Sequence, residues 1–327
     1  MNSAKKMVIA VAVIGSVAAI FFYNQAKLAP QNATKIVVNV DNDVATAINA
    51  VPARQAATIR KHPLAAANSP SLALIRQYES STDKRKFYDI ARLQPESGGA
   101  FLALKVATEC MLWVKNNNSN AQQMQKWIDE TPKDSPNAGE HIAAIKKLLE
   151  PCLGFDKSPA NIKEVASMAK AAQTIDPALK IQKSIREKYE PNGDLSAVSG
   201  VVAEAIKSGN PYAIQSALQA LGSGTIDYKN VNNIVGGTEL IPQDAKAFWD
   251  AMQLAACQFG VDCGPDSWPA LSNCVAGSCN LNLYQHIQST MTPEQYANVM
   301  RYHALIVDGL YRGDFDVIKV ERRNFKK

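Results

Sequence analysis

Apolar residues recur along most of the chain at the three- and four-residue spacing of a helix that buries one face. The clearest case is 194–222, where two apolar stripes flank the sequence Gly209-Asn210-Pro211. Glycine commonly ends a helix, asparagine caps the next one, and proline fits its first position. Because this connection is so short, we predict two antiparallel neighbouring helices, the second ending at Gly222.

The same periodicity, with cap and proline signals, predicts helices elsewhere. They are expected over 70–78, 100–115, 121–129, 138–150 and 242–260, with one more capped by Thr82 or Asp83 and another from the capping box Thr292-Pro293-Glu294-Gln295 to Gly313. Residues 225–240 are expected to form a loop insertion. Aromatic residues make up only 7% of the chain, which disfavours a β-sandwich or barrel. We therefore predict an all-α fold, with helical hairpins packed as a bundle or an irregular α-solenoid.

The N-terminus carries a membrane signal. Lys5 and Lys6 precede 17 uncharged, mainly apolar residues, 7–23. At about 1.5 Å per residue this run approaches the thickness of a bilayer core, and it ends in aromatic residues typical of the membrane interface. We predict a signal-anchor over 1–27 that crosses the inner, cytoplasmic membrane once with 7–23 and leaves the body in the periplasm. A cleaved secretory signal, giving a secreted or periplasmic protein, is the alternative.

Composition divides the rest of the chain. Residues 28–69 are rich in alanine and asparagine with scattered prolines, so we expect a linker or stalk before a helical domain at 70–318. Residues 319–327 form a basic tail of net charge +4, which we expect to be solvated. The body, 28–318, holds 27 basic and 29 acidic residues although the whole chain has a net charge of +5. A body without a concentrated basic face argues against nucleic-acid binding.

The cysteines carry the strongest chemical signal. An even number of cysteines in an exported chain predicts disulfides. Sequence distance suggests one bridge between Cys110 and Cys152 and two within 257–279, where three pairings stay open. Glycine and proline turns in this block leave little apolar area to bury, so covalent ties are the expected stabiliser and we predict a disulfide-rich C-terminal segment. The six residues are Cys110, Cys152, Cys257, Cys263, Cys274 and Cys279.

Metal and cofactor sites find little support. A zinc site is the alternative for the cysteine block, with His286 seven residues after Cys279, but its spacers differ from the usual short knuckles. Asp262, Asp266 and Asn273 do not have the spacing of a calcium-binding loop. The chain also has no phosphate-binding glycine loop. We therefore predict no metal and no cofactor.

One carboxylate gives a catalytic alternative. The sequence Glu96-Ser97-Gly98-Gly99 resembles the start of the lytic transglycosylase motif, in which the glutamate is a general acid. That resemblance implies a peptidoglycan-cleaving hydrolase with Glu96 as its acid. The rest of the motif is absent.

Two further resemblances concern the fold and the cellular location of the protein. Residues 210–222 are similar to Sel1-like α-repeats, although no fixed period recurs. Over about 70–315 the chain resembles uncharacterised exported helical proteins of proteobacteria. That resemblance is carried by Phe87-Tyr88, Gly98-Gly99, Cys110 and the sequence from Ala256 to Cys263. It implies a helical fold and an envelope address but no activity.

The predicted function follows from this architecture. An array of helical hairpins offers grooves for a protein partner, whereas an enzyme needs a converging polar cleft. We predict a non-catalytic interaction or assembly module of the cell envelope, bound to an envelope protein. The alternative is an envelope hydrolase. Trp249 precedes the cysteine block and Trp268 lies within it, and core packing is the expected role of both.

Overall fold

The computed structural model describes residues 70–112, 119–189, 196–225, 233–235, 238–240, 242–318 and 320–322. All of them belong to one compact unit, Lys61–Lys327. The predicted signal-anchor, the predicted linker and the last five residues of the basic tail lie outside the described residues. Among the helices that are described, none combines the length and the hydropathy that a membrane crossing requires.

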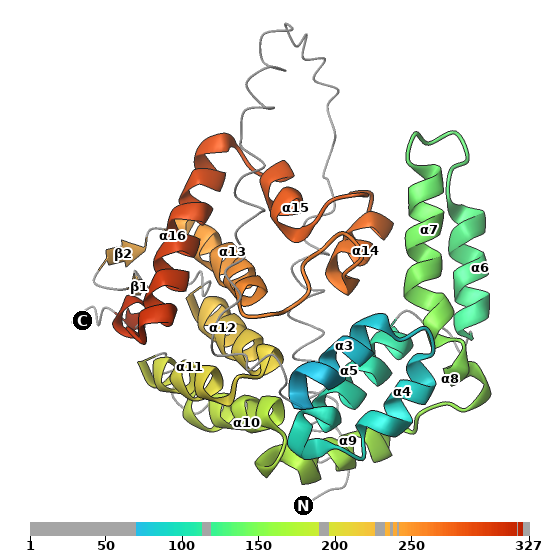
Figure 1. Cartoon of the computed structure of the whole chain (residues 1–327). Helices are drawn as coiled ribbons and strands as arrows, with labels where there is room; N and C mark the ends of the chain where they lie inside the picture. Colours follow the sequence, from blue (N-terminus) through green and yellow to red (C-terminus); the bar gives the residue numbers. More distant parts are fainter. Residues whose placement is uncertain are drawn as a thin grey trace, which may run out of the picture. The chain divides into compact units, whose positions relative to one another are not determined.

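The first described helices follow the sequence prediction (Figure 1). The Asp83 side chain caps α4 by accepting a hydrogen bond from the Lys86 amide at 3.0 Å. At the start of α5, Gly99 lies against the Ala91 carbonyl, where a Cβ would have no room. The elements are α3 (Pro70–Ser80), α4 (Lys84–Ala91), the 3₁₀ helix η2 (Pro95–Ser97) and α5 (Gly99–Leu112).

The next segment contains both predicted and unexpected helices. The hairpin of α6 and α7 matches the predicted 121–129 and 138–150, whereas α8 to α10 had no prediction. Asp176 explains how α10 is placed: it is fully buried and accepts hydrogen bonds from the amides of Ala178 at 3.0 Å and of Phe101 at 2.8 Å. The elements are α6 (Asn120–Glu130), α7 (Ala138–Leu149), η3 (Glu150–Cys152), α8 (Gly154–Lys157), α9 (Ile162–Ala171), η4 (Ala172–Thr174) and α10 (Pro177–Tyr189).

The predicted hairpin within 194–222 is confirmed as α11 (Ser196–Ser208) and α12 (Pro211–Thr225). Asn210 caps α12 by accepting hydrogen bonds from the Tyr212 and Ala213 amides at 3.0 and 3.1 Å. The prediction that Gly222 ends the second helix was wrong, because α12 continues to Thr225. A glycine inside a helix costs only about 1 kcal/mol relative to alanine, which packing against neighbouring helices can offset.

The C-terminal part supplies the remaining helices. The predicted capping box of α16 is present, since Thr292 Oγ1 accepts from the Gln295 amide at 3.3 Å and Gln295 Oε1 accepts from the Thr292 amide at 3.0 Å. Gly313 ends α16 in the left-handed conformation, with φ of 71°. The elements are α13 (Pro242–Gln258), α14 (Trp268–Val275), α15 (Leu283–Ser289), α16 (Pro293–Arg312) and η5 (Asp316–Ile318).

A small antiparallel sheet corrects two predictions. Strands β1 (Asn233–Val235) and β2 (Thr238–Leu240) lie where we expected a loop insertion, and β3 (Val320–Arg322) comes from the tail that we expected to be solvated. The strand order is β2-β1-β3. Strands of three residues are too short to show an alternating pattern, and β3 pairs with a strand far away in sequence. Local sequence patterns therefore could not predict the strands or their pairing.

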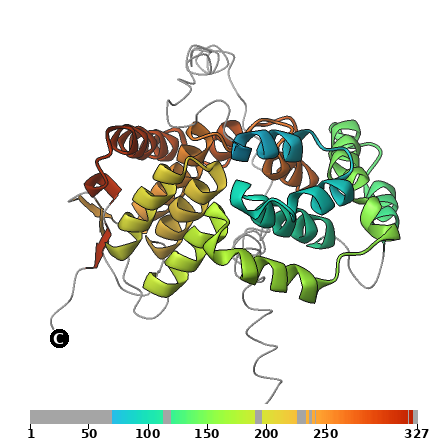
Figure 2. The same cartoon turned by 60° about the horizontal axis from the view of Figure 1, so that its bottom comes forward.

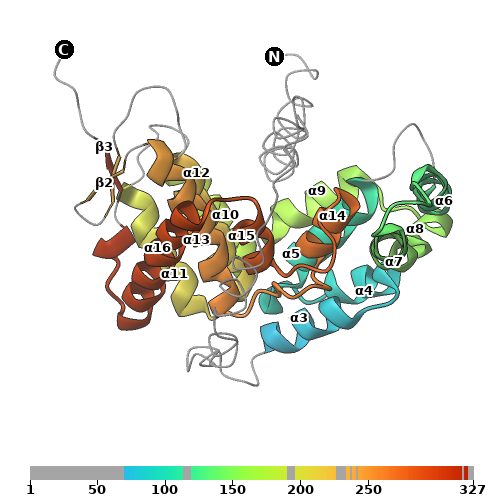
Figure 3. The ribbon, with the colours of Figure 1, turned by 90° about the horizontal axis from the view of Figure 1, so that it is seen from above.

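The helices pack as the predicted fold class requires. α10, α11 and α12 lie side by side (Figure 2), α12 also packs against α13, and α16 covers α13. α14, from the disulfide-rich segment, packs against α7 (Figure 3). The all-α fold of packed hairpins is therefore confirmed. Its main apolar core runs through the fully buried side chains of Phe87, Leu102, Leu218, Leu221, Phe248, Met252, Leu254, Ile306 and Leu310.

Candidate functional site

Charged and aromatic side chains meet where α3, α4, α5 and α12 converge. We call Tyr78, Lys84, Lys105, Glu109 and Tyr212 the charged–aromatic cluster. Glu109 is only 6% exposed, yet it carries a carboxylate. The Tyr78 hydroxyl lies 2.8 and 2.7 Å from its two oxygens, and Lys105 Nζ lies 2.8 Å from Oε1. A buried carboxylate is tolerated because these donors replace the water that it has lost.

The lysines of the cluster also lie over aromatic rings. Lys84 Nζ is 3.8 Å from the centre of the Tyr78 ring and donates a hydrogen bond to the Tyr78 carbonyl at 2.6 Å. Lys105 Nζ lies 5.8, 5.5 and 5.7 Å from the ring centres of Tyr78, Tyr212 and Trp268. The negative face of an aromatic ring attracts a cation at such distances. Trp268 therefore contacts the cluster from α14 as well as packing in the core.

Burial changes the acid–base properties of the cluster. Burial, with repulsion from Glu109 as a smaller cause, raises the pKa of Tyr78 well above its usual 10. Burial also raises the pKa of Tyr212 well above 10. Burial lowers the pKa of Lys84 to about 8, although attraction to Glu109 opposes this shift. Both phenols are therefore hydrogen-bond donors at neutral pH rather than bases.

Glu79 lies at the edge of the cluster. Its pKa is raised to about 7, first by burial and then by repulsion from Asp262, while Lys84, Arg76 and Lys105 act in the opposite direction. The residue as a whole is exposed, so water screens part of these interactions. A carboxylate that titrates near neutrality is characteristic of functional sites and also of structural ion networks.

The sequence analysis singled out neither Glu79 nor any residue of the charged–aromatic cluster. The available signal was the pair Lys105 and Glu109, two charges four residues apart in a strongly apolar helix. The sequence candidate Glu96 lies elsewhere: it is exposed on η2, before α5 begins, whereas Glu109 is near the end of α5. The structure therefore does not bring Glu96 and Glu109 together.

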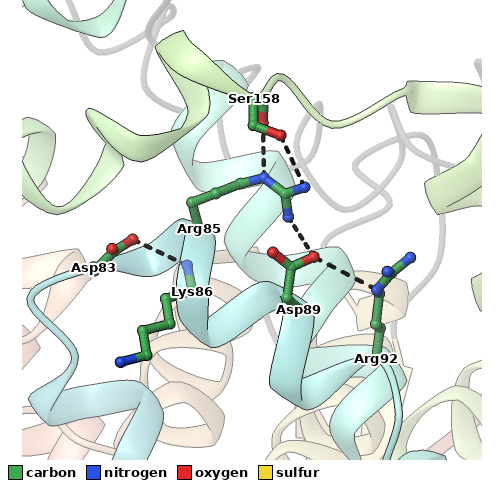
Figure 4. Close-up of polar contacts among 6 residues, drawn as sticks. All are labelled: Asp83, Arg85, Lys86, Asp89, Arg92 and Ser158. Carbon is green, nitrogen blue, oxygen red and sulfur yellow. Dashed lines mark hydrogen bonds and ion pairs between the residues drawn. The ribbon is translucent and has the colours of Figure 1, made fainter.

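A second polar network involves side chains of α4 and Ser158 (Figure 4). Arg85 Nε donates to the Ser158 carbonyl at 2.7 Å and Nη1 donates to Asp89 at 2.7 Å, while Arg92 Nε is 3.6 Å from Asp89. The Arg85 guanidinium also lies 5.5 Å from the Phe155 ring centre. This network ties the helix that presents Lys84 to the segment after α8.

All six cysteines are paired, which decides among the three pairings that the sequence left open. The predicted bridge between Cys110 and Cys152 is confirmed, with Cα atoms 5.3 Å apart. The other two bridges join Cys257 to Cys263 and Cys274 to Cys279. These two bridges use the four thiols on which the alternative zinc site at this block depended. In the described part of the chain, no group of three or more potential ligands is placed to hold a metal ion.

The C-terminal part contains two histidines: His303 is buried and His286 is half-buried. His303 is buried on α16, its Nε2 lies 3.3 Å from the Tyr284 hydroxyl, and Gln258 donates to that hydroxyl at 3.0 Å. Burial lowers the pKa of His303 to about 4, although its hydrogen bond to the Leu254 carbonyl favours the charged form. His303 is therefore neutral at physiological pH. Burial also lowers the pKa of His286, and Lys246 adds to that shift.

A small hollow lies between α6, α7 and α14. Its volume is about 200 Å³, and it is lined by Trp127, Glu130, Thr131, His141 and Val275. Pockets for small-molecule ligands usually measure about 300–1,000 Å³. The hollow is therefore smaller than a usual small-molecule pocket.

Comparison of the chain with protein-family models, with curated proteins and with solved structures finds no match. The resemblances to Sel1-like repeats and to exported proteobacterial proteins stay predictions.

Proposed function

We propose that the helical domain is a non-catalytic interaction or assembly module of the cell envelope, held at the inner membrane by residues 7–23. The observation that supports it is the internal pairing of the charged–aromatic cluster. Glu109 is bound by Tyr78 and Lys105, and Lys84 is bound by the Tyr78 carbonyl and ring. A catalytic carboxylate or amine must instead reach a substrate atom.

The disulfides support the envelope address. Three bridges that use every cysteine of the chain are typical of an oxidising compartment and rare in the cytosol. The apolar run at 7–23 with Lys5 and Lys6 before it gives the membrane attachment and its direction. Alkaline extraction of membranes tests this part. The protein should stay in the pellet at full length, and release of a shorter soluble form would contradict the anchor.

Site-specific photo-crosslinking in living source cells tests the interaction itself. A photoreactive residue is introduced into the full chain at exposed positions on different helices, such as Gln125 on α6 and Lys180 on α10. We expect neighbouring positions on one face to give an adduct with the same envelope protein, identified by mass spectrometry, and positions on other faces to give none. Absence of a discrete adduct from every face would refute the proposal.

A hydrolase is the second candidate, with Glu79 in place of Glu96 as the general acid. The observation that favours it is the pKa of Glu79, which burial and, to a smaller extent, repulsion from the Asp262 carboxylate raise to about 7. General acids in glycoside hydrolysis have raised pKa values of this kind. Incubation of the full-length protein with peptidoglycan sacculi decides the matter. Release of soluble fragments that is lost in Glu79→Gln and kept in Glu96→Gln would replace the first proposal with the second.

A further inference from the structure

We propose that the disulfide between Cys257 and Cys263 is a redox-controlled clamp, which fixes the position of α14 when it is oxidised and releases α14 when a dithiol reduces it. This inference goes beyond the proposed function, because it concerns the helices of this chain and needs no partner. We call residues 264–282, which lie between the bridge and α15, the α14 arm.

The α14 arm belongs to a second apolar core. Leu271 and Val275 of α14 pack against a group of buried α7 side chains, in a cluster that is separate from the main core. α13, in contrast, contributes Phe248 and Leu254 to the main core. Figure 1 correspondingly shows α14 between α15 and α7. The chain therefore passes from one core to the other between α13 and α14.

The bridge lies at this passage. Cys257 is in the last turn of α13, and Phe259 and Val261, within the loop that the bridge closes, are buried in the main core. The Cys263 carbonyl accepts a hydrogen bond from the Leu283 amide at 3.1 Å, so the two ends of the α14 arm meet beside the bridge. Because the disulfide fixes Cys263 to α13, it fixes both ends of the arm to the main core.

The bridge is also accessible to a reductant. Cys257 and Cys263 are both half-buried, whereas Cys110 and Cys152 are only 1% and 3% exposed. Thiol–disulfide exchange requires an attacking thiolate to reach a sulfur atom, so access decides which bridge reacts first. The loop closed by Cys257 and Cys263 is short, with a sequence separation of 6 against 42, so opening it removes less stability from the fold. The protein can therefore lose this bridge and stay folded.

Reduction of the bridge is a two-electron exchange. One thiolate of the dithiol attacks a sulfur of the bridge, the S–S bond breaks, and the other cysteine leaves as a thiolate that takes up a proton. The second thiol of the dithiol then attacks the mixed disulfide and releases the first cysteine. The protein gains two electrons and two protons, and the dithiol becomes a disulfide. A disulfide oxidant runs the same exchange in reverse and closes the clamp.

The first measurement determines which bridge a dithiol opens. Full-length protein is incubated under native conditions with increasing dithiothreitol, free thiols are alkylated with N-ethylmaleimide, and mass spectrometry of peptides locates them. We expect alkylation of Cys257 and Cys263 at a dithiothreitol concentration roughly tenfold below that needed for Cys110 and Cys152. Reduction of the second pair at the same or a lower concentration would overturn the inference.

Hydrogen exchange then measures the release of α14. When this bridge is reduced, amides of α14 and α7 should exchange roughly tenfold faster, because α7 loses the helix that covers its buried side chains. Amides of α11 and α12 should keep their protection. Unchanged exchange of α14 and α7 would mean that packing alone holds the arm, and equal acceleration in all four helices would mean that the bridge holds the whole fold. Either result would contradict a clamp.

Two double variants separate the clamp from the general loss of a disulfide. Cys257→Ala with Cys263→Ala should give the fast exchange of α14 and α7 without any reductant. Cys274→Ala with Cys279→Ala removes a bridge of similar sequence separation, 5, that lies within the α14 arm. Since the ends of the arm stay fixed in that variant, α7 should stay protected. Fast exchange of α7 in both variants, or in neither, would refute the proposal.

Discussion

Two buried regions of this protein are held together in different ways. The packing of α11, α12, α13 and α16 buries apolar side chains, among them Leu218, Phe248 and Ile306, all at 0% exposure. The charged–aromatic cluster buries a carboxylate and parts of two lysines instead, and each charge has a named partner. The first region gains free energy from the area removed from water, which does not depend on direction. The second gains only when its donors and acceptors are in place.

This difference affects what each region can tolerate. An apolar core accepts changes of shape at a cost that follows the volume lost, and its stability does not depend on charge. A buried ion network returns little net stability, because desolvation cancels much of the attraction, but it is costly to break. Such a network fixes the relative positions of helices more than it stabilises them. Here it sets α3 and α4 against α5 and α12.

The largest effect is expected in the apolar core. Phe248→Ala should lower the free energy of unfolding by about 3–5 kcal/mol, because the Phe248 ring is fully buried. It packs edge-on against the Tyr302 ring, with the two ring centres 5.8 Å apart. Urea unfolding of the purified protein measures it. Leu305→Ala, at an apolar residue that is 41% exposed on α16, is the control and should change stability by less than about 0.5 kcal/mol. Similar losses in both variants would contradict the core described here.

The disulfide on α5 comes next. Replacing both Cys110 and Cys152 by alanine should cost roughly 4 kcal/mol, because the bridge closes a long loop with a sequence separation of 42. The matched double variant of Cys257 and Cys263, with a separation of 6, should cost roughly 2 kcal/mol. Urea unfolding without reductant compares them. Thiol titration of the denatured wild-type protein should find no free thiols, and any that react would argue against these bridges.

Breaking the charged–aromatic cluster should have a smaller effect. Glu109→Gln should cost about 1–3 kcal/mol, because Lys105 and Tyr78 lose a buried anionic partner. The control is Glu187→Gln, which breaks another Lys–Glu pair of the same four-residue spacing, with Lys183, but at an exposed site. That variant should cost less than about 1 kcal/mol. Equal costs would mean that Glu109 is not buried in solution.

Acidification should weaken the C-terminal part of the core. The pKa of His303 is about 4 in the folded protein and near 6.5 when unfolded, so the unfolded chain binds more protons between these values. Its contribution to stability is complete above pH 6.5 and is lost as the pH falls toward 4, by at most about 1.4 kcal/mol per pH unit. Urea unfolding at several pH values measures this slope. It should flatten in His303→Gln, and an unchanged slope in that variant would assign the effect elsewhere.

Glu79, at the edge of the charged–aromatic cluster, should make stability depend on pH in the opposite direction. The pKa of Glu79 is about 7 when folded and near 4.5 when unfolded, so the folded protein binds more protons in this window. Its contribution is complete below pH 4.5 and is lost as the pH rises through 7. The effect should be small because Glu79 is exposed. Hydrogen exchange of α3 measures it, and the wild-type protein and Glu79→Gln should differ in the pH dependence of protection.

The helices that the sequence predicted, with their caps and one disulfide, were accessible because they depend on near neighbours, whereas α8, α9, α10, α14 and α15 were not predicted. Asn210 caps α12 and Thr292 caps α16 through atoms three residues away or fewer, and apolar stripes repeat within each helix. Cysteine number and distance were enough for the bridge from Cys110 to Cys152. The end of α12, which continues past Gly222 to Thr225, shows the limit of such signals.

Only the tertiary structure decided which residues far apart in the sequence come into contact. Tyr78 and Glu109 are 31 positions apart, and Tyr212 is much farther along the chain, so no local pattern links them. The sheet that joins β1 to β3, and the hollow that combines Trp127, His141 and Val275, have the same origin. The sequence determined most of the longer helices and an oxidised cysteine set, because hydrogen bonds along a helix act over short distances and the number of cysteines is read directly from the chain. Packing decided which side chains share a site, because burial is gained only when whole helices meet.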